Sequence, residues 1–251
     1  MIRSGNEDNF AVDLNADRGV FMVADGMGGH AAGEVASEMA VQIVLRELTA
    51  LHDISAATAG QQVAQALRHA NRAIHDRTLT EVDKQGMGTT ASVLLLSGSR
   101  YLIGQVGDSR VYLLRDGALV QLTKDHSYVQ EQVDLGNLTP EQARYHPYSN
   151  VITRCVGASP DVEPDVYTGE VRVGDVYLVA SDGLTGMVDD RRLAQLLMAR
   201  SAPERKVAAL ISEANGRGGL DNITAIVVHV ESGDEGRPEA RTTEMRTVTE
   251  A

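Results

Sequence analysis

Hydrophobic and polar positions alternate in blocks along the chain, and the spacing changes between blocks. Residues 9–14 alternate and residues 20–24 (VFMVA) are uninterruptedly apolar, with a polar turn sequence between them. This pattern predicts a β-hairpin at the start of the chain. From Gly33 the apolar residues recur every three to five positions, which predicts a helix with one buried face (Val35, Met39, Ile43 and Leu48). A second helix is expected over residues 61–79.

The rest of the chain is dominated by strand patterns, with a pair of helices before the last strand. Residues 89–123 and 166–183 read as successive strands, residues 190–199 and 203–215 as two helices, and residues 223–230 as a last strand. Strands in runs with helices in pairs are typical of antiparallel sheets covered by helices. The sequence therefore predicts an α+β fold.

Two segments show neither a strand pattern nor one long helical pattern. Residues 124–164, called the flap below, contain two short helical stretches, and the second begins with a capping box at Thr139, Pro140 and Gln142. A long segment of this kind between strands is often a lid or a binding loop. Residues 232–251 are polar and aperiodic, so we expect a disordered tail after a catalytic domain spanning residues 1–231.

Composition narrows the class of protein. The 251 residues are 43% hydrophobic and 23% charged, as in ordinary globular proteins, and no apolar run is long enough to cross a membrane. No signal peptide opens the chain, and the single cysteine, Cys155, excludes an internal disulfide, so we expect a protein of the reducing cytoplasm. The net charge of −12 argues against nucleic acid as a partner. The surplus carboxylates serve solubility or converge on metal ions.

Four aspartates occupy similar positions relative to strands. Asp25, Asp108 and Asp182 each follow an apolar strand, and Asp221 precedes the last one. Each alone is more typical of a turn, but carboxylates at strand ends can meet at one sheet edge. Oxygen ligands without a nearby cysteine or histidine pair favour Mg²⁺ or Mn²⁺ over zinc. A fifth aspartate, in Asp116-Gly117, lies between two alternating strands and predicts an ordinary hairpin turn.

Six motifs in chain order carry a resemblance to a known family. The segments RSGNED, VADGMGGHAAGEVAS, GMGTT, VGDSRVYLLRDG, SDGL and GGLDNIT together resemble the signature of type 2C metal-dependent serine/threonine protein phosphatases of the bacterial branch. The similarity runs from Arg3 to about Val230. It implies two antiparallel β-sheets sandwiched between pairs of α-helices.

The resemblance also implies a set of metal ligands. Asp25 would bridge two central Mn²⁺ or Mg²⁺ ions, with the Gly26 carbonyl as a further ligand. Asp182 and Asp221 would complete this pair of sites. Asp108 would hold a third, weaker ion together with Asp182.

Other residues receive roles from the same resemblance. Arg3 would bind the substrate phosphate through its guanidinium group. Glu7 and Asp8 would act mainly through metal-bound waters. The flap would lie near the substrate entrance.

Two features depart from the family pattern. Relatives carry about ten residues before the arginine motif, whereas only Met1 and Ile2 precede Arg3, so we expect either a truncated start or a missing first strand and a less firmly held Arg3. Some eukaryotic members have a histidine after the Asp-Gly pair as general acid, and Met27 stands there in this chain. The leaving-group proton would then come from a metal-bound water, and we interpret His30 as a structural residue.

The remaining histidines and the cysteine receive structural interpretations. We expect His126 and His146 to be exposed in the flap and Cys155 to be a small packing residue.

The leading functional hypothesis is hydrolysis of phosphoserine and phosphothreonine in proteins by a water activated between two metal ions. The partners would be phosphoproteins made by a serine/threonine kinase, and we expect a monomer. Two alternatives stay open: the same chemistry on small phosphoesters or phosphohistidine, and a non-catalytic relative that binds phosphoproteins or metals. Inactive relatives lose metal aspartates or the arginine, which this chain keeps.

Overall fold

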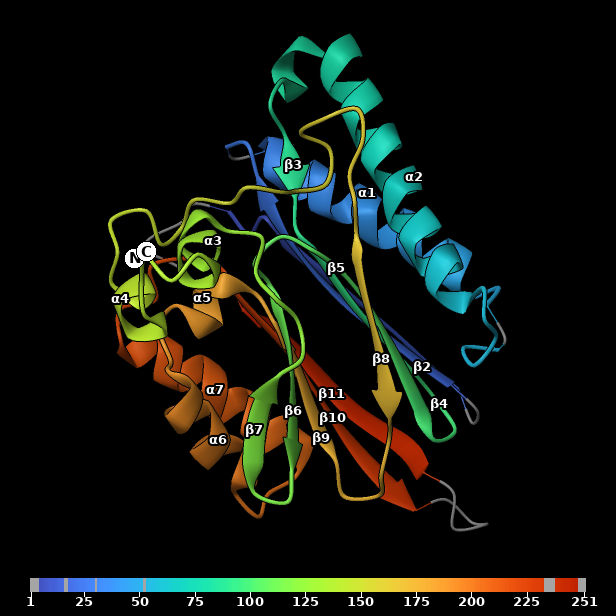
Figure 1. Cartoon of the computed structure of the whole chain (residues 1–251), viewed down its shortest axis with the longest axis vertical. Helices are drawn as coiled ribbons and strands as arrows, with labels where there is room; N and C mark the ends of the chain where they lie inside the picture. The colour runs from blue at the N-terminus through green and yellow to red at the C-terminus, as the bar shows by residue number, and fades with distance from the viewer. Residues whose placement is uncertain (1–4, 16–17, 30, 52, 233–237, 248–251) are drawn as a thin grey trace.

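The computed structural model describes residues 5–15, 18–29, 31–51, 53–232 and 238–247. Strands and helices follow the expected order along the chain (Figure 1). Their bounds are β1 Asp8–Asn15, β2 Arg18–Met27, α1 Ala31–Leu48, α2 Ala59–Thr80, η1 Val82–Lys84, β3 Gly88–Thr89, β4 Ala91–Ser97, β5 Arg100–Val106, β6 Arg110–Arg115, β7 Ala118–Gln121, α3 Tyr128–Asp134, α4 Pro140–Arg144, β8 Asp165–Glu170, β9 Val176–Ala180, α5 Asp182–Thr185, α6 Asp190–Met198, α7 Pro203–Gly216, β10 Ile223–Ser232 and β11 Pro238–Thr247.

The strands form two sheets. The first has the order β1-β2-β4-β5-β8, with β3 beside β2, and the second has the order β11-β10-β9-β6-β7. Every pairing between these strands is antiparallel. Helices α1 and α2 cover the outer face of the first sheet, and α6 and α7 cover the second (Figure 1). The predicted sandwich is confirmed. Among the described helices, none is long and apolar enough to cross a membrane.

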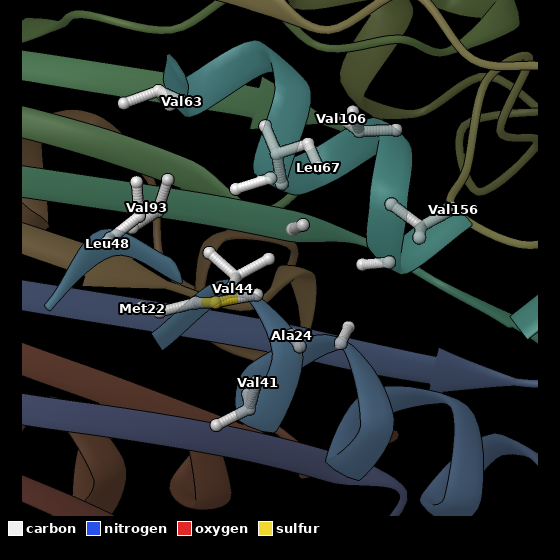
Figure 2. Close-up of a cluster of buried hydrophobic side chains, with 14 of the residues drawn as sticks. Met22, Ala24, Val41, Val44, Leu48, Val63, Leu67, Val93, Val106 and Val156 are labelled. Carbon is white, nitrogen blue, oxygen red and sulfur yellow. The ribbon is translucent and has the colours of Figure 1, made fainter. Parts of the chain in front are cut away.

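The apolar run of β2 is explained by burial on both faces. Phe21 and Val23 pack between the two sheets. Met22 and Ala24 point the other way, toward Val44 and Leu48 of α1, as Figure 2 shows. Successive side chains of a strand alternate between faces, so a strand covered on both sides needs apolar residues at every position.

The buried face of α1 is shifted by one residue at three of the four predicted positions, and the fourth, Leu48, is buried as predicted. The fully buried positions are Ala36, Ala40, Val44 and Leu48, whereas Val35, Met39 and Ile43 are only partly buried at the side. Small alanine side chains let the helix approach the sheet closely. A prediction based on bulky apolar residues therefore points to the side of the helix and not to the face that contacts the sheet.

The C-terminal segment also differs from the prediction. Instead of an irregular tail after Glu231, β10 continues to Ser232 and β11 pairs with it, placing Ile223 opposite Thr247. Without β11, β10 would be an edge strand with unpaired backbone groups, and pairing satisfies them whatever the side chains. Polarity alone therefore misread this segment.

Candidate metal-binding and catalytic site

Aspartates from separate parts of the chain meet where the two sheets approach each other. Asp8 and Asp25 lie opposite each other in the β1–β2 pair. Asp182 follows β9 and Asp221 precedes β10, and these two strands are paired in the second sheet. The carboxyl of Asp25 lies close enough to those of Asp8, Asp182 and Asp108 to feel their charges, and that of Asp8 feels Asp182 and Asp221. Five aspartates from five segments of the chain thus form one carboxylate cluster.

Asp8 is the most enclosed member of this cluster, with no exposed surface. Its Oδ2 accepts hydrogen bonds from Thr224 Oγ1 at 2.7 Å and Ser181 Oγ at 2.9 Å, while its buried Oδ1 has no hydrogen-bond partner. Burial raises the pKa of Asp8 to about 7; the two hydroxyls oppose the shift, and the charges of Asp182 and Asp221 add to it.

The backbone of Asp25 is fixed by two threonines. Its N–H donates to Thr90 Oγ1 at 2.9 Å, and its carbonyl accepts from the Thr90 N–H at 2.8 Å and from Thr89 Oγ1 at 2.9 Å. Burial, followed by the charges of nearby carboxylates, raises the pKa of Asp25 well above its usual range. The threonines therefore hold in place a carboxylate whose ionisation is costly without a cation.

The glycines beside the aspartates permit close backbone crossings. A Cβ on Gly26 would lie 2.1 Å from the Gly33 carbonyl oxygen, and one on Gly183 would lie 1.9 Å from that of Asn222. The Gly26 N–H also donates to the Glu7 carbonyl at 3.1 Å. The Asp-Gly pairs at 25–26 and 182–183 thus bring chain segments together that no larger residue would admit.

Glu7 is tied to the far end of the chain. Its N–H donates to Asn222 Oδ1 at 2.9 Å, its carbonyl accepts from Ser37 Oγ at 2.6 Å, and its side chain is buried. Asn222 Nδ2 in turn donates to the Gly5 carbonyl at 3.1 Å. This amide fixes the segment before β1 against the segment that carries Asp221.

Asp108 lies on the same edge, after β5. Only 6% of its surface is exposed, and its Oδ1 is buried without a hydrogen-bond partner. Burial and then the charges of Asp182 and Asp125 raise its pKa well above the usual range, partly offset by Arg110. Its neighbour Ser109 places Oγ 2.7 Å from Thr90 Oγ1, so a chain of hydroxyls joins the backbones around Asp108 and Asp25.

This donor set suits a hard cation. In the described residues no three His, Cys, Asp or Glu side chains are grouped tightly enough to hold a metal ion as they stand. Yet the side chains of the cluster offer only oxygen atoms as ligands, and the Oδ1 atoms of Asp8 and Asp108 are buried without a hydrogen-bond partner. Burial and mutual repulsion make it costly to ionise these carboxyl groups. A divalent cation that prefers oxygen ligands stabilises their ionised form. The residues present fit Mg²⁺ or Mn²⁺.

Several site residues were not found by sequence reasoning. The hydroxyl and amide groups that hold the aspartates come from Thr89, Thr90, Ser109, Ser181, Asn222 and Thr224. Three of them (Ser109, Ser181 and Asn222) are sequence neighbours of a candidate ligand, a signal that was available. Arg3 and His30 lie outside the described residues.

The flap residues were only partly predicted. Contrary to expectation, His126 is buried, with 6% of its surface exposed, because its ring is enclosed by Gly107, Arg154 and Asp165. His146 is partly buried beside the rings of Tyr128 and Tyr148. Cys155 is partly buried and burial raises the pKa of its thiol, in agreement with a packing role. The capping box at Thr139 is confirmed.

Family, sequence and structure comparisons all match this chain to one protein family. Residues 3–213 match the family described as Protein phosphatase 2C. The chain is 39% identical to the serine/threonine phosphatase stp of Listeria monocytogenes, over 94% of both chains. It is 41% identical to the serine/threonine protein phosphatase PstP of Mycobacterium tuberculosis, over 94% of this chain and 44% of that protein.

Solved structures agree in fold. The S. agalactiae serine/threonine phosphatase superposes with a TM-score of 0.85 at 38% identity. The match covers 92% of this chain and 96% of the S. agalactiae chain. The catalytic domain of PstP in complex with two manganese ions superposes with a TM-score of 0.78 at 36% identity, covering 96% and 94%.

Proposed function

The chain belongs to the protein phosphatase 2C family, and we propose that it hydrolyses phosphoserine and phosphothreonine in proteins with Mn²⁺ or Mg²⁺ as cofactor. The observation that carries this proposal is the convergence of five buried or half-buried aspartates on one edge of the sandwich. The manganese ions in the related PstP catalytic domain support the choice of metal.

We assign the ligands as follows. Asp25, the Gly26 carbonyl, Asp182 and Asp221 would hold two central ions, and Asp108 with Asp182 a third. Glu7 and Asp8 would contribute through ordered waters, and the free Oδ1 of Asp8 is available for such a bond. When bound, two such ions lower the pKa of a water molecule and supply a nucleophile near neutral pH.

The residues of the chain itself hold the site rigid and bind the substrate. Thr89 and Thr90 fix the backbone of Asp25, and Ser181 and Thr224 orient Asp8. Arg3 would contact the phosphate with two N–H groups. Arg3→Ala should therefore reduce kcat/KM by about ten- to a hundred-fold, mainly by raising KM, and Arg3→Lys should recover only part of the loss. Unchanged kinetics of Arg3→Ala would assign phosphate binding to the metal ions alone.

We infer that the flap influences which phosphoprotein enters. Arg144 of α4 donates to the Gly186 carbonyl at 3.2 Å, directly after the helix that Asp182 begins. Figure 1 shows α4 near α5, in agreement with this hydrogen bond. A protein substrate that reaches the aspartates would therefore pass this segment.

The test compares the turnover of three substrates with and without Mn²⁺. Purified protein is assayed with a phosphothreonine peptide, a small aryl phosphate and a phosphohistidine peptide, in Mn²⁺ and after exhaustive chelation. We expect the highest kcat/KM on the phosphothreonine peptide and no turnover in chelator. A preference for the aryl phosphate or for phosphohistidine would reassign the substrate class. Tight peptide binding without turnover would indicate a non-catalytic relative, and full activity in chelator would refute metal dependence.

Two further expectations concern the setting of the reaction. Its substrates are products of serine/threonine kinases, since phosphoserine and phosphothreonine in proteins arise by that reaction. We propose that the enzyme acts as a monomer in the cytoplasm, where its single cysteine stays reduced. Cell fractionation and light scattering of the purified protein measure these two properties.

A further inference from the structure

His126 links the start of the flap to the loop that carries Asp108. The His126 Nδ1 accepts a hydrogen bond from the Gly107 N–H at 3.0 Å, and the His126 N–H donates to the Gly107 carbonyl at 2.9 Å. Gly107 directly precedes Asp108. Its φ is +101°, and a Cβ there would lie 2.6 Å from the Thr90 side chain. Both backbone polar groups of this tightly placed glycine are thus bound by one residue.

The other side of the ring faces the end of the flap. Its Nε2 lies 3.3 Å from Asp165 Oδ2, at the first residue of β8, and 2.9 Å from Arg154 Nη1. Arg154 Nη1 also donates to Asp165 Oδ1 and to the Glu163 carbonyl, both at 2.8 Å. The His126 carbonyl in addition accepts from the Thr153 N–H at 2.8 Å. The entry and exit of the flap therefore meet at this side chain.

These contacts assign the tautomer of His126. A neutral imidazole has one N–H, so its two nitrogens cannot both accept. The Gly107 N–H is a fixed donor toward Nδ1, whereas Arg154 has two oxygen acceptors of its own. The proton consequently belongs on Nε2, where it is donated to Asp165. Burial and the charge of Arg154 lower the pKa of His126, which favours this neutral form.

We propose that His126 is a positioning residue that fixes the Gly107–Asp108 loop from the flap and so sets the affinity of Asp108 for the third metal ion. The inference builds on the metal-dependent function proposed above. Asp108 Oδ1 is buried without a hydrogen-bond partner, so its direction depends on how the backbone before it is held. A residue that holds a metal ligand from outside affects metal affinity by about 10- to 100-fold.

Two amide substitutions separate the two sides of the ring. In His126→Asn the amide oxygen takes the place of Nδ1 and can still accept from Gly107, whereas in His126→Gln the amide takes the place of Nε2 and reaches only Asp165. Mn²⁺ binding is measured by electron paramagnetic resonance of free Mn²⁺ and by calorimetry. We expect the dissociation constant of the weakest Mn²⁺ to rise about ten-fold or more in His126→Gln and to change less than about three-fold in His126→Asn. Equal affinities in both variants, or equal losses, would overturn the proposal.

A second pair of variants leaves the ring in place. Asp165→Asn can donate to Nε2 and move the proton to Nδ1, facing the Gly107 N–H, so the weakest Mn²⁺ should bind less tightly. Tyr167→Phe removes the hydroxyl that donates to Asp165 Oδ2 at 3.1 Å and accepts from the Lys124 N–H at 3.3 Å, but it leaves the Asp165 carboxylate and the His126 ring unchanged and serves as the matched control. Nitrogen NMR of the intact protein should show Nε2 protonated and Nδ1 unprotonated at His126. The opposite tautomer in the parent protein, or unchanged Mn²⁺ affinity in Asp165→Asn, would contradict the proposal.

The parent protein is measured alongside for Mn²⁺ binding and for phosphopeptide turnover. If it neither binds Mn²⁺ nor turns over phosphopeptide, the proposed function fails. If it does both and the His126 variants bind Mn²⁺ alike, only the positioning role fails.

Discussion

The dipeptide Asp-Gly occurs three times in the chain, and two of its copies, Asp25-Gly26 and Asp116-Gly117, have different structural roles. Asp116-Gly117 joins β6 to β7, with Arg115 opposite Ala118, and both its residues have positive φ (+52° and +79°). Both residues are exposed, and a Cβ on Gly117 would meet nothing within 4 Å. This is the hairpin turn that the flanking alternation predicts.

Asp25-Gly26 lies within β2 and continues toward α1. Gly26 is required by a crossing chain, since its missing Cβ would lie 2.1 Å from the Gly33 carbonyl oxygen. Asp25 is bound through its backbone by Thr89 and Thr90 and leaves its carboxyl among other carboxylates. Gly117 is needed for a backbone conformation with positive φ, whereas Gly26 is needed because another chain segment crosses close to it. Of these two glycines, only Gly26 lies beside the carboxylate cluster.

The largest expected effect is on catalysis. Asp25→Asn keeps the size of the side chain but removes its charge, so activity on a phosphothreonine peptide should fall by at least about a hundred-fold while the protein stays folded. Asp116→Asn should keep near-parental activity, because Asn-Gly forms the same turn. Steady-state rates in saturating Mn²⁺, with circular dichroism as a control for folding, measure both. Equal losses would remove the distinction between the two pairs.

A second comparison stays within the carboxylate cluster. Asp182 is assigned to both central and third ions and Asp108 only to the third, so Asp182→Ala should reduce kcat by at least about a hundred-fold and Asp108→Ala by clearly less. The difference should persist in saturating Mn²⁺. The reverse ranking would show that the ligand assignment is wrong.

Substitutions of Gly26 and Gly117 should lower the stability of the protein by different amounts. Gly26→Ala forces a backbone displacement at a buried crossing and should lower the free energy of unfolding by several kcal/mol, about the upper range of single substitutions. Gly117→Ala meets open space and should cost about 1–2 kcal/mol, the penalty of a left-handed backbone for a residue with a Cβ. Urea unfolding of both variants measures the difference, and a larger loss for Gly117→Ala would contradict the crossing argument.

The smallest expected effect is a pH dependence in the absence of metal. Burial raises the pKa of Asp8 from 3.8 to about 7, so between these values the folded state keeps a proton that the unfolded state releases. The contribution of Asp8 to stability therefore falls as pH rises from about 4 to about 7. Asp8→Asn removes this titration, and its stability relative to the parent should increase by about 2–3 kcal/mol between pH 5 and pH 8.

Urea unfolding in chelator at both pH values, with the exposed Asp116→Asn as control, provides the measurement. A difference between Asp8→Asn and the parent that stays constant with pH would show that the Asp8 carboxyl does not titrate as described.

The three features that differ from the sequence-based predictions share one physical cause. The buried face of α1, the strand β11 and the burial of His126 were each misread because their surroundings come from distant segments. Alanines of α1 are buried by a closely approaching sheet, and His126 is enclosed by residues 107 and 165. The backbone of β11 pairs with that of β10. Composition and periodicity describe a residue and its neighbours in the chain. They do not describe what another segment presents to it.

The order of strands and helices up to β10, the turn at Asp116, the family and the aspartates of the cluster follow from the sequence alone, because each depends on local spacing or on the order of residues along the chain. Tertiary structure alone decided which atoms hold those aspartates and how costly their charges are. Thr90, Thr224 and His126 act on groups 65, 216 and 19 residues away in the chain. Burial and charge repulsion, which raise the pKa values of Asp8, Asp25 and Asp108, exist only after folding has excluded water and brought five segments together.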